Sequence, residues 1–384
     1  MDPHGRSGSC APAARRREVL LAGIAATAAA LPSPVLASAP DGEGLRAVAA
    51  RRGIPFGIAA RGGILRNDTA FAAAAAREAA MLVPEVAGKW RALRPAEGVY
   101  DFTDLDEITA FAARHGQAVR GHTLVWHAAM KDWTLAALAE GPARGHAMLE
   151  SHIDRVLGHT ASAIRDWDVV NEALADPWTS TEPFRDSPWL RNLGPGYVEL
   201  AFRLARQRDP GLRLTYNDYG CEHDTEADDQ KRRRVLALVR GLRDRGAPVD
   251  AVGMQGHLHR DGAFSARRVA EFVRSIRELG LDVLITELDV LEPETRSDPS
   301  ERDAKCASLV HAFVSTVLEE GGKAVLCWGL SDPYSWANRT PRSPPAEGAP
   351  GPPAPARPLP LDADLRRKPM WHALARAFEG RPWP

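Results

Sequence analysis

Trp167-Asp168-Val169-Val170-Asn171-Glu172-Ala173 is a short, mostly apolar stretch that ends in an amide and a carboxylate. A buried strand of a parallel barrel has this composition and carries its reactive residues at its carboxyl end. The stretch Val283-Leu284-Ile285-Thr286-Glu287-Leu288-Asp289 repeats the pattern and again delivers a glutamate after an apolar run. The two stretches therefore predict two buried strands that present Glu172 and Glu287 to one site.

Two carboxyl groups that face each other across a cleft are the minimal equipment for hydrolysis of a glycosidic bond. One protonates the leaving oxygen, and the other attacks the sugar or activates water. Asn171, immediately before Glu172, adds an amide that can hydrogen-bond a sugar hydroxyl beside the reacting carbon. A single glutamate at a strand end is usually a solvated charge, so the hypothesis depends on the pair.

Apolar runs alternate with longer helical patterns from Arg46 onward, which is typical of repeated βα units. Eight such runs are the number that closes a (β/α)8 or TIM barrel, so we expect an α/β fold with a single catalytic domain. An open doubly wound sheet ranks second because no glycine-rich phosphate loop follows the first run. The expected strands are Phe56–Ala59, Ala80–Val83, Ala118–His122, Asp166–Asn171, Leu212–Asn217, Ala251–Gln255, Val283–Glu287 and Ala324–Trp328.

Helical patterns fill the intervals between these runs. The pattern over Gln230–Arg245 has a charged outer face whose arginines we expect to be solvated. The stretch Thr340–Pro360, rich in Pro, Gly and Ala, predicts a long loop before a terminal helix that completes the barrel. The expected helices include Leu105–His115, Ala147–Ala163, Gly196–Arg208, Gln230–Arg245 and Pro369–Phe378.

The N-terminus has the composition of an export signal. Arg15-Arg16-Arg17 precede an Ala-rich apolar segment that runs to Leu36 and resembles a twin-arginine signal. Prolines at positions 32 and 34 interrupt the segment, which makes a retained membrane anchor the poorer interpretation. We therefore expect a signal over residues 1–39, cleaved after Ala37 or Ala39, and a domain over residues 40–384. The mature protein would be periplasmic or secreted, away from the membrane, and monomeric.

Charge and cysteine content narrow the function further. The net charge of −1 leaves no basic stripe for a nucleic-acid partner once the N-terminal arginines are set aside. Cys221, Cys306 and Cys327 would remain after signal removal, an odd number with no zinc-like spacing. One disulfide is possible, with the pairing open. We expect no metal and no cofactor, because the chemistry needs only two carboxyl groups and water.

From about Val48 to Phe378 the chain resembles glycoside hydrolase family 10, the endo-β-1,4-xylanases. The resemblance implies a (β/α)8 barrel and retaining hydrolysis of β-1,4-xylosidic bonds in xylan or xylo-oligosaccharides. It rests on six motifs in the family's order: Arg120–His127 (RGHTLVWH), Trp167–Ala173 (WDVVNEA), Tyr216–Tyr219 (YNDY), Gly253–His257 (GMQGH), Ile285–Asp289 (ITELD) and Trp328–Trp336 (WGLSDPYSW).

The resemblance also implies roles for single residues. Glu172 matches the acid/base and Glu287 the nucleophile, which in a retaining pair stand roughly 5–5.5 Å apart. Glu172 should then meet an environment less favourable to charge than Glu287, so that it stays protonated near neutral pH. His257 matches the histidine that contacts the nucleophile, and Asp289 is expected to orient it. The expected substrate-binding residues are Glu85, Lys89, His122, Trp126, Asn171, Tyr219, Gln255 and the aromatic walls Trp328 and Trp336.

The chain departs from the family at one subsite. The family usually has Pro-Glu-Asn-Glu-Met-Lys-Trp where this chain has Pro84-Glu85-Val86-Ala87-Gly88-Lys89-Trp90. Val86 cannot make the asparagine's bond to the distal xylose, a loss of about 1–3 kcal/mol. Ala128-Ala129-Met130-Lys131 also replace the glutamine common after His127. The alternatives to a xylanase that acts on plain polymer are an enzyme for short or branched chains, an enzyme for another β-1,4-glucan, and a non-catalytic sugar-binding barrel.

Overall fold

The computed structural model describes residues 42–293, 295, 297–339 and 354–384. The expected export signal over residues 1–39 lies outside the described residues, as do residues 340–353 of the Pro-rich stretch. Within the described ranges, no helix combines the length and the apolar character that a membrane crossing requires.

Eight parallel strands of the described chain close into a barrel, which confirms the (β/α)8 expectation. Neighbours pair in the order β6-β5-β4-β3-β2-β1-β9-β8, and a direct pairing of β6 with β8 closes the ring. This closure excludes the open doubly wound sheet. The strands are β1 (Phe56–Ala60), β2 (Met81–Pro84), β3 (Ala118–Trp126), β4 (Ile164–Asn171), β5 (Arg213–Asp218), β6 (Ala251–Met254), β7 (His257–His259), β8 (Asp282–Leu291) and β9 (Val325–Cys327).

The short strand β7 was not expected from the sequence. It follows β6 after two residues and pairs in parallel with the end of β8, where His257 lies opposite Asp289. The chain therefore leaves the barrel wall at Gln255 and Gly256 and returns beside the extended tip of β8. This excursion brings the His257 side chain next to the tip that carries Glu287.

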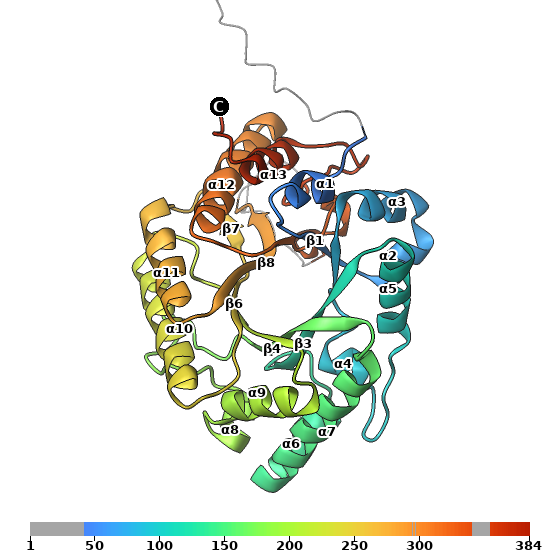
Figure 1. Ribbon diagram of the computed structural model, residues 1–384, viewed down its shortest axis with the longest axis vertical. Coiled ribbons are helices and arrows are strands. Elements are labelled where there is room, and N and C mark those ends of the chain that lie inside the picture. Colours follow the sequence, from blue (N-terminus) through green and yellow to red (C-terminus); the bar gives the residue numbers. More distant parts are fainter. Residues whose placement is uncertain (1–41, 294, 296, 340–353) are drawn as a thin grey trace, which may run out of the picture. The chain divides into compact units, whose positions relative to one another are not determined.

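Helices surround the strands as a ring (Figure 1). The predicted helices are present, and each begins within five residues of its expected start. In the described chain they are α1 (Leu45–Ala50), α2 (Gly62–Asn67), α3 (Thr69–Glu78), α4 (Trp90–Leu93), α5 (Thr103–Arg114), α6 (Asp132–Ala139), α7 (Pro142–Thr160), α8 (Pro188–Leu193), α9 (Tyr197–Arg208), α10 (Glu226–Asp244), α11 (Ala266–Glu278), α12 (Pro299–Glu319) and α13 (Pro369–Glu379), with 3-10 turns η1 (Asp332–Tyr334) and η2 (Trp336–Asn338).

Local chemistry explains where several helices begin. Thr225, Ser265 and Asp298 each accept a hydrogen bond from a first-turn backbone N–H, at α10, α11 and α12. Such caps satisfy donors that have no partner within the helix. Proline occupies the first turn of α7, α8, α12 and α13, where its missing N–H has no consequence.

The expectation that the arginines of α10 are solvated is partly wrong. Arg232 is buried and donates to the backbone oxygens of Cys221 and His223. Arg234 is half-buried and donates to the backbone oxygen of Ala175. Both arginines donate to loops that follow β4 and β5. Helix α10 therefore holds these loops through guanidinium hydrogen bonds as well as apolar contacts.

Strand β4 lies in the middle of the core because its side chains pack on both faces of the sheet. Trp167, Val169 and Val170 are all fully buried. Gly121 of β3 leaves room for the Trp167 indole, since a Cβ there would lie 2.2 Å from the ring. The apolar run therefore fixes the strand, and the polar residues that follow it are delivered at its carboxyl end.

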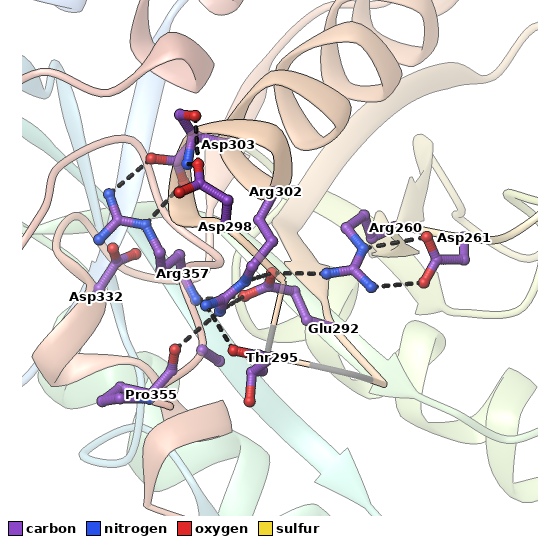
Figure 2. A network of polar contacts seen from close by, with 12 residues as sticks. Arg260, Asp261, Glu292, Thr295, Asp298, Arg302, Asp303, Asp332, Pro355 and Arg357 are labelled. Atoms are coloured by element: carbon purple, nitrogen blue, oxygen red, sulfur yellow. Dashed lines mark hydrogen bonds and ion pairs between the residues drawn. The ribbon is translucent and has the colours of Figure 1, made fainter. Parts of the chain in front are cut away.

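A buried network of charges holds the last part of the barrel together (Figure 2). Arg302 of α12 forms a bidentate pair with Glu292, which follows β8, at 2.7 and 2.8 Å. Arg302 also donates to the backbone oxygen of Pro355, and Glu292 accepts from the backbone N–H of Arg357. Figure 2 shows this pair between Arg260 on one side and the Arg357–Asp303 pair on the other. The network fixes the chain after residue 354 against β8 and α12.

The three cysteines of the expected mature domain are buried and free: Cys221, Cys306 and Cys327. Burial raises the pKa of each thiol, to about 12 for Cys306. The possible disulfide among them is therefore not formed in this structure.

Replacing Arg302 by methionine should destabilise the fold. Its side chain is 2% exposed and that of Glu292 is 0% exposed, so the substitution leaves a buried carboxylate short of its main partner. We expect the free energy of unfolding in guanidinium chloride to fall by about 3–5 kcal/mol. Arg366→Met, which removes an exposed pair with Asp364, should change it by less than about 1 kcal/mol. Equal stabilities of the two variants would contradict the stabilising role of the buried network.

Candidate active site

A cavity of about 650 Å³ opens at the carboxyl ends of the barrel strands. It is lined by every residue expected at the site except Asp289, which is fully buried behind His257. The expected residues that line it are Glu85, Lys89, His122, Trp126, Asn171, Glu172, Tyr219, Gln255, His257, Glu287, Trp328 and Trp336.

Glu172 lies immediately after β4 in a strained conformation. Its φ of 57° is in the left-handed region, which a residue with a side chain seldom adopts and which often marks a functional position. Its Oε2 accepts a hydrogen bond from Trp126 Nε1 at 2.8 Å. Its Oε1 accepts from Asn171 Nδ2 and Gln255 Nε2, each at 3.0 Å. Three donors thus hold the carboxylate in place.

The expectation that Glu172 stays protonated near neutral pH is wrong in direction, whereas its comparison with the environment of Glu287 stays a prediction. Burial raises the pKa of this carboxyl group, but hydrogen bonds from Gln255 and Trp126 lower it, as do the charges of His127 and Arg185. The balance leaves the pKa of Glu172 below the ordinary value of a glutamate. The donors come from several strands, so the sequence pattern could not reveal them.

Glu287, near the tip of β8, is joined to Glu172 through two side-chain amides. Asn217 Nδ2 donates to Glu287 Oε1 at 2.7 Å and to Asn171 Oδ1 at 2.8 Å. Asn171 in turn donates to Glu172. A Cβ at position 253 would lie 2.2 Å from Asn217 Oδ1, so Gly253 of the Gly-Met-Gln-Gly-His motif makes room for this bridge.

His257 lies between two carboxylates. Its Nδ1 donates to Asp289 Oδ1 at 2.7 Å, and its Nε2 is 3.4 Å from Glu287 Oε2. Burial lowers the pKa of His257, but Asp289 and Glu287 raise it by more, so the net pKa is well above that of a free histidine. The two carboxylates therefore favour the protonated form of this ring. Trp336 Nε1 donates to the other oxygen of Asp289 at 2.7 Å.

His122 and Lys89 also line the cavity. His122 Nδ1 is 3.0 Å from Asp168 Oδ2, whose other oxygen pairs with buried Arg120. The Lys89 ammonium lies 4.6 Å from the centre of the Trp126 ring and 5.6 Å from that of Trp328. Burial lowers the pKa of Lys89, although Glu287, Glu85 and Glu172 oppose this effect.

Glu85 is held by two arginines. Arg61 binds its carboxylate through two N–H groups, each at 3.0 Å, and Arg339 binds it as well. The neighbouring Val86 is 46% exposed. The segment that departs from the family pattern thus has an arginine-paired carboxylate that lines the cavity, followed by an exposed apolar side chain.

Several lining residues were not expected. Trp178 is 59% exposed and lies in the loop after β4. A tryptophan in a polar loop has little core to join, and that signal could have identified it. No comparable signal marks Glu222 and His223 in the loop after β5, Asp228 in the first turn of α10, or His259 at the end of β7, all of which line the cavity. Among the described residues, no group of three or more His, Cys, Asp or Glu side chains is placed to hold a metal ion.

Comparison with known proteins agrees with this geometry. The solved structure of xylanase 10B from Thermotoga petrophila RKU-1 in complex with xylobiose superposes with a TM-score of 0.78 at 29% identity, covering 88% of this chain and 97% of that one. Native xylanase 10B from Thermotoga maritima gives 0.77 at 30% identity, covering 88% and 98%.

Sequence comparison gives the same result. Endo-1,4-beta-xylanase 1 of Humicola insolens is 31% identical over 352 residues, which cover 91% of this chain and 77% of that protein. Endo-1,4-beta-xylanase B of Paenibacillus barcinonensis is 36% identical over 265 residues, covering 66% and 77%. Residues 44–377 match the family described as Glycosyl hydrolase family 10. The chain belongs to glycosyl hydrolase family 10.

Proposed function

We propose that this family 10 hydrolase is an endo-β-1,4-xylanase that cleaves xylan or xylo-oligosaccharides with retention of configuration. The observation that carries the proposal is the pair of glutamates in one cavity, joined through the amides of Asn171 and Asn217. The roughly 5–5.5 Å separation of a retaining pair stays a prediction.

In the first step, Glu287 is the nucleophile and Glu172 the acid. Glu287 attacks the anomeric carbon while Glu172 protonates the leaving oxygen, which forms a covalent glycosyl-enzyme and releases the first product. His257 and Asn217 hold Glu287 in one orientation through Nε2 and Nδ2. Asp289 keeps the imidazole in place and is a positioning residue, since it does not line the cavity.

In the second step, Glu172 acts as the base. It removes a proton from water, which attacks the anomeric carbon and frees Glu287. The donors from Trp126, Asn171 and Gln255 favour the carboxylate that this step needs. The bound sugar and the neutral ester at Glu287 then change the field around Glu172 between the two steps.

The sugar itself is held by rings and polar groups. The indoles of Trp328 and Trp336 cover apolar sugar faces, while Lys89, His122 and Gln255 meet the hydroxyl rim. Val86 and the arginine-bound Glu85 support a distal glycone subsite that binds weakly. We therefore propose that short chains are cleaved well relative to polymer.

Export and oligomeric state complete the proposal. The twin arginines and the Ala-rich segment that follows them support export to the periplasm or the medium, after cleavage near Ala37 or Ala39. We also propose that the protein is a monomer. Mass spectrometry of the exported protein, together with light scattering, tests both points.

Substitution of either glutamate should remove activity without unfolding the barrel. For Glu287→Gln we expect kcat/KM on xylohexaose to fall by at least about 10⁴-fold, because no nucleophile remains. For Glu172→Gln we expect a loss of about 10²–10⁴-fold, which is the usual contribution of an acid/base. NMR of the wild-type reaction should show the β-anomer first. A first product in the α-form, or normal activity in either variant, would reject the mechanism.

Removal of the Trp126 donor should shift the pH dependence. Trp126→Phe deprives the Glu172 carboxylate of its 2.8 Å hydrogen bond, so its pKa rises. Because the protonated acid is the active form in the first step, the alkaline limb of the kcat/KM profile should move up by about 0.5–1 pH unit. Trp133→Phe, which alters an indole that donates to the backbone of Arg94, should leave the limb in place. A shift to lower pH would contradict this assignment.

Trp178 should matter for sugar binding rather than for chemistry. Its exposed indole at the cavity edge offers a platform for a sugar ring. We expect Trp178→Ala to raise KM for xylohexaose by about tenfold, on the order of 1–2 kcal/mol, with little change in kcat. Leu135→Ala, which shortens an exposed apolar side chain of α6, is the matched control. An unchanged KM would remove Trp178 from the binding surface.

A further inference from the structure

The strained backbone of Glu172 needs support from its surroundings. A residue in the left-handed region with φ of 57° persists only when neighbouring contacts fix it. The Glu172 backbone N–H donates to the backbone oxygen of Asn217 at 2.9 Å. On the other side of the residue, the Glu172 backbone oxygen accepts from Arg185 Nε at 3.2 Å. Among the side chains that the structure describes, Arg185 is the one that donates a hydrogen bond to this peptide oxygen.

Arg185 reaches Glu172 because the chain after β4 folds back on itself. Leu174 bridges Phe184 in antiparallel fashion, and the backbone N–H of Arg185 donates to the oxygen of Ala173 at 2.9 Å. This return places the guanidinium next to the residue that it supports. The side chain is 19% exposed, so water weakens its contacts only in part.

The guanidinium is itself held on its far side. Arg185 Nη2 donates to both carboxylate oxygens of Asp176, at 3.1 and 3.3 Å, and to the Tyr219 hydroxyl at 2.8 Å. The Tyr219 hydroxyl donates to Asp176 at 2.8 Å. Fully buried Lys231 lies 3.4 Å from Asp176 and 2.9 Å from Asp218. The network behind Glu172 thus pairs two basic side chains, Arg185 and Lys231, with two acidic ones, Asp176 and Asp218.

We propose that Arg185 is a positioning residue for the acid/base: it fixes the strained peptide of Glu172 and supplies the positive charge that tunes its carboxyl group. This inference rests on the proposed function. It adds a role to a residue that lies outside the lining of the catalytic cavity and acts only through Glu172.

The charges around Glu172 show why Arg185 should affect proton transfer. His127 Nδ1 is 3.8 Å from Glu172 Oε2, and burial lowers the pKa of that histidine, so it is a weak source of charge at neutral pH. Lys89 acts on Glu287 and Glu85 as well as on Glu172. Buried Asp218 opposes ionisation of its neighbours but is paired with Lys231. Arg185 is therefore a permanent cation within hydrogen-bond distance of the Glu172 peptide oxygen, and its charge lowers the pKa of the Glu172 carboxyl group.

The test compares leaving groups, because only a poor leaving group needs the acid. Aryl β-xylobiosides with phenol and with 2,4-dinitrophenol as leaving groups share one sugar and differ in their demand for protonation. For Arg185→Met we expect kcat/KM to fall about 10–100-fold with the phenyl compound and less than about threefold with the dinitrophenyl compound. The alkaline limb should move to higher pH, since the loss of a cation raises the pKa of Glu172.

Controls separate this role from a structural one. Arg191→Met removes an exposed arginine of α8 that pairs with Asp186, and it should change neither rate. Arg185→Lys should retain part of the activity, because lysine keeps the positive charge but lacks the several N–H donors of the planar guanidinium. If Arg185→Met does not fold, Tyr219→Phe removes one support of the guanidinium, and it should give a smaller loss with the same dependence on leaving group.

Two results would overturn the inference. An equal loss with both aryl compounds would show that Arg185 only maintains the fold, and an unchanged alkaline limb would show that its charge does not reach Glu172. Failure of the wild type to hydrolyse either compound would instead reject the proposed function. The two failures are therefore distinct.

Discussion

The side-chain amide of Asn217 is the interaction on which the site depends. It lies 2.7 Å from Glu287 and 2.8 Å from Asn171, so it sets the relative position of two carboxylates that come from separate strands of the barrel. The parallel register makes this possible, because Asn171 of β4 lies opposite Asn217 of β5. The other polar groups of the cavity are arranged around that pair.

The surrounding charges divide into separate groups on the two sides of this bridge. On one side, His257 lies between Asp289 and Glu287; burial lowers its pKa, but these two carboxylates raise it by more. On the other, neutral donors and Arg185 surround Glu172. Two carboxylates close together repel each other, and here each has its own stabilising partners. The Glu172 carboxyl group therefore has a lowered pKa although Glu287 lines the same cavity.

The sequence predicted the strands well because a buried apolar run bounded by polar residues suits few structures besides a barrel strand. It also located many of the residues that line the cavity, since barrel strands carry them at their ends. Strand β7 was missed because three residues, His257–His259, have no apolar pattern. The burial of Arg232 and the pKa of Glu172 were predicted wrongly, because both depend on partners from distant strands and loops. Contacts between residues that are far apart in the chain leave no pattern within one stretch of sequence.

Asp289 binds two groups at once, and this restricts how the enzyme can change. One of its oxygens binds His257 and the other binds the indole of Trp336. The indole of Trp336, which lines the cavity, and the imidazole beside Glu287 are thus bound to the same carboxylate. A substitution of Trp336 that widens the cleft for a bulkier sugar also frees an oxygen of Asp289 and alters its hold on His257. Substrate range and reactivity are therefore inherited together, and a variant selected for one will carry a change in the other.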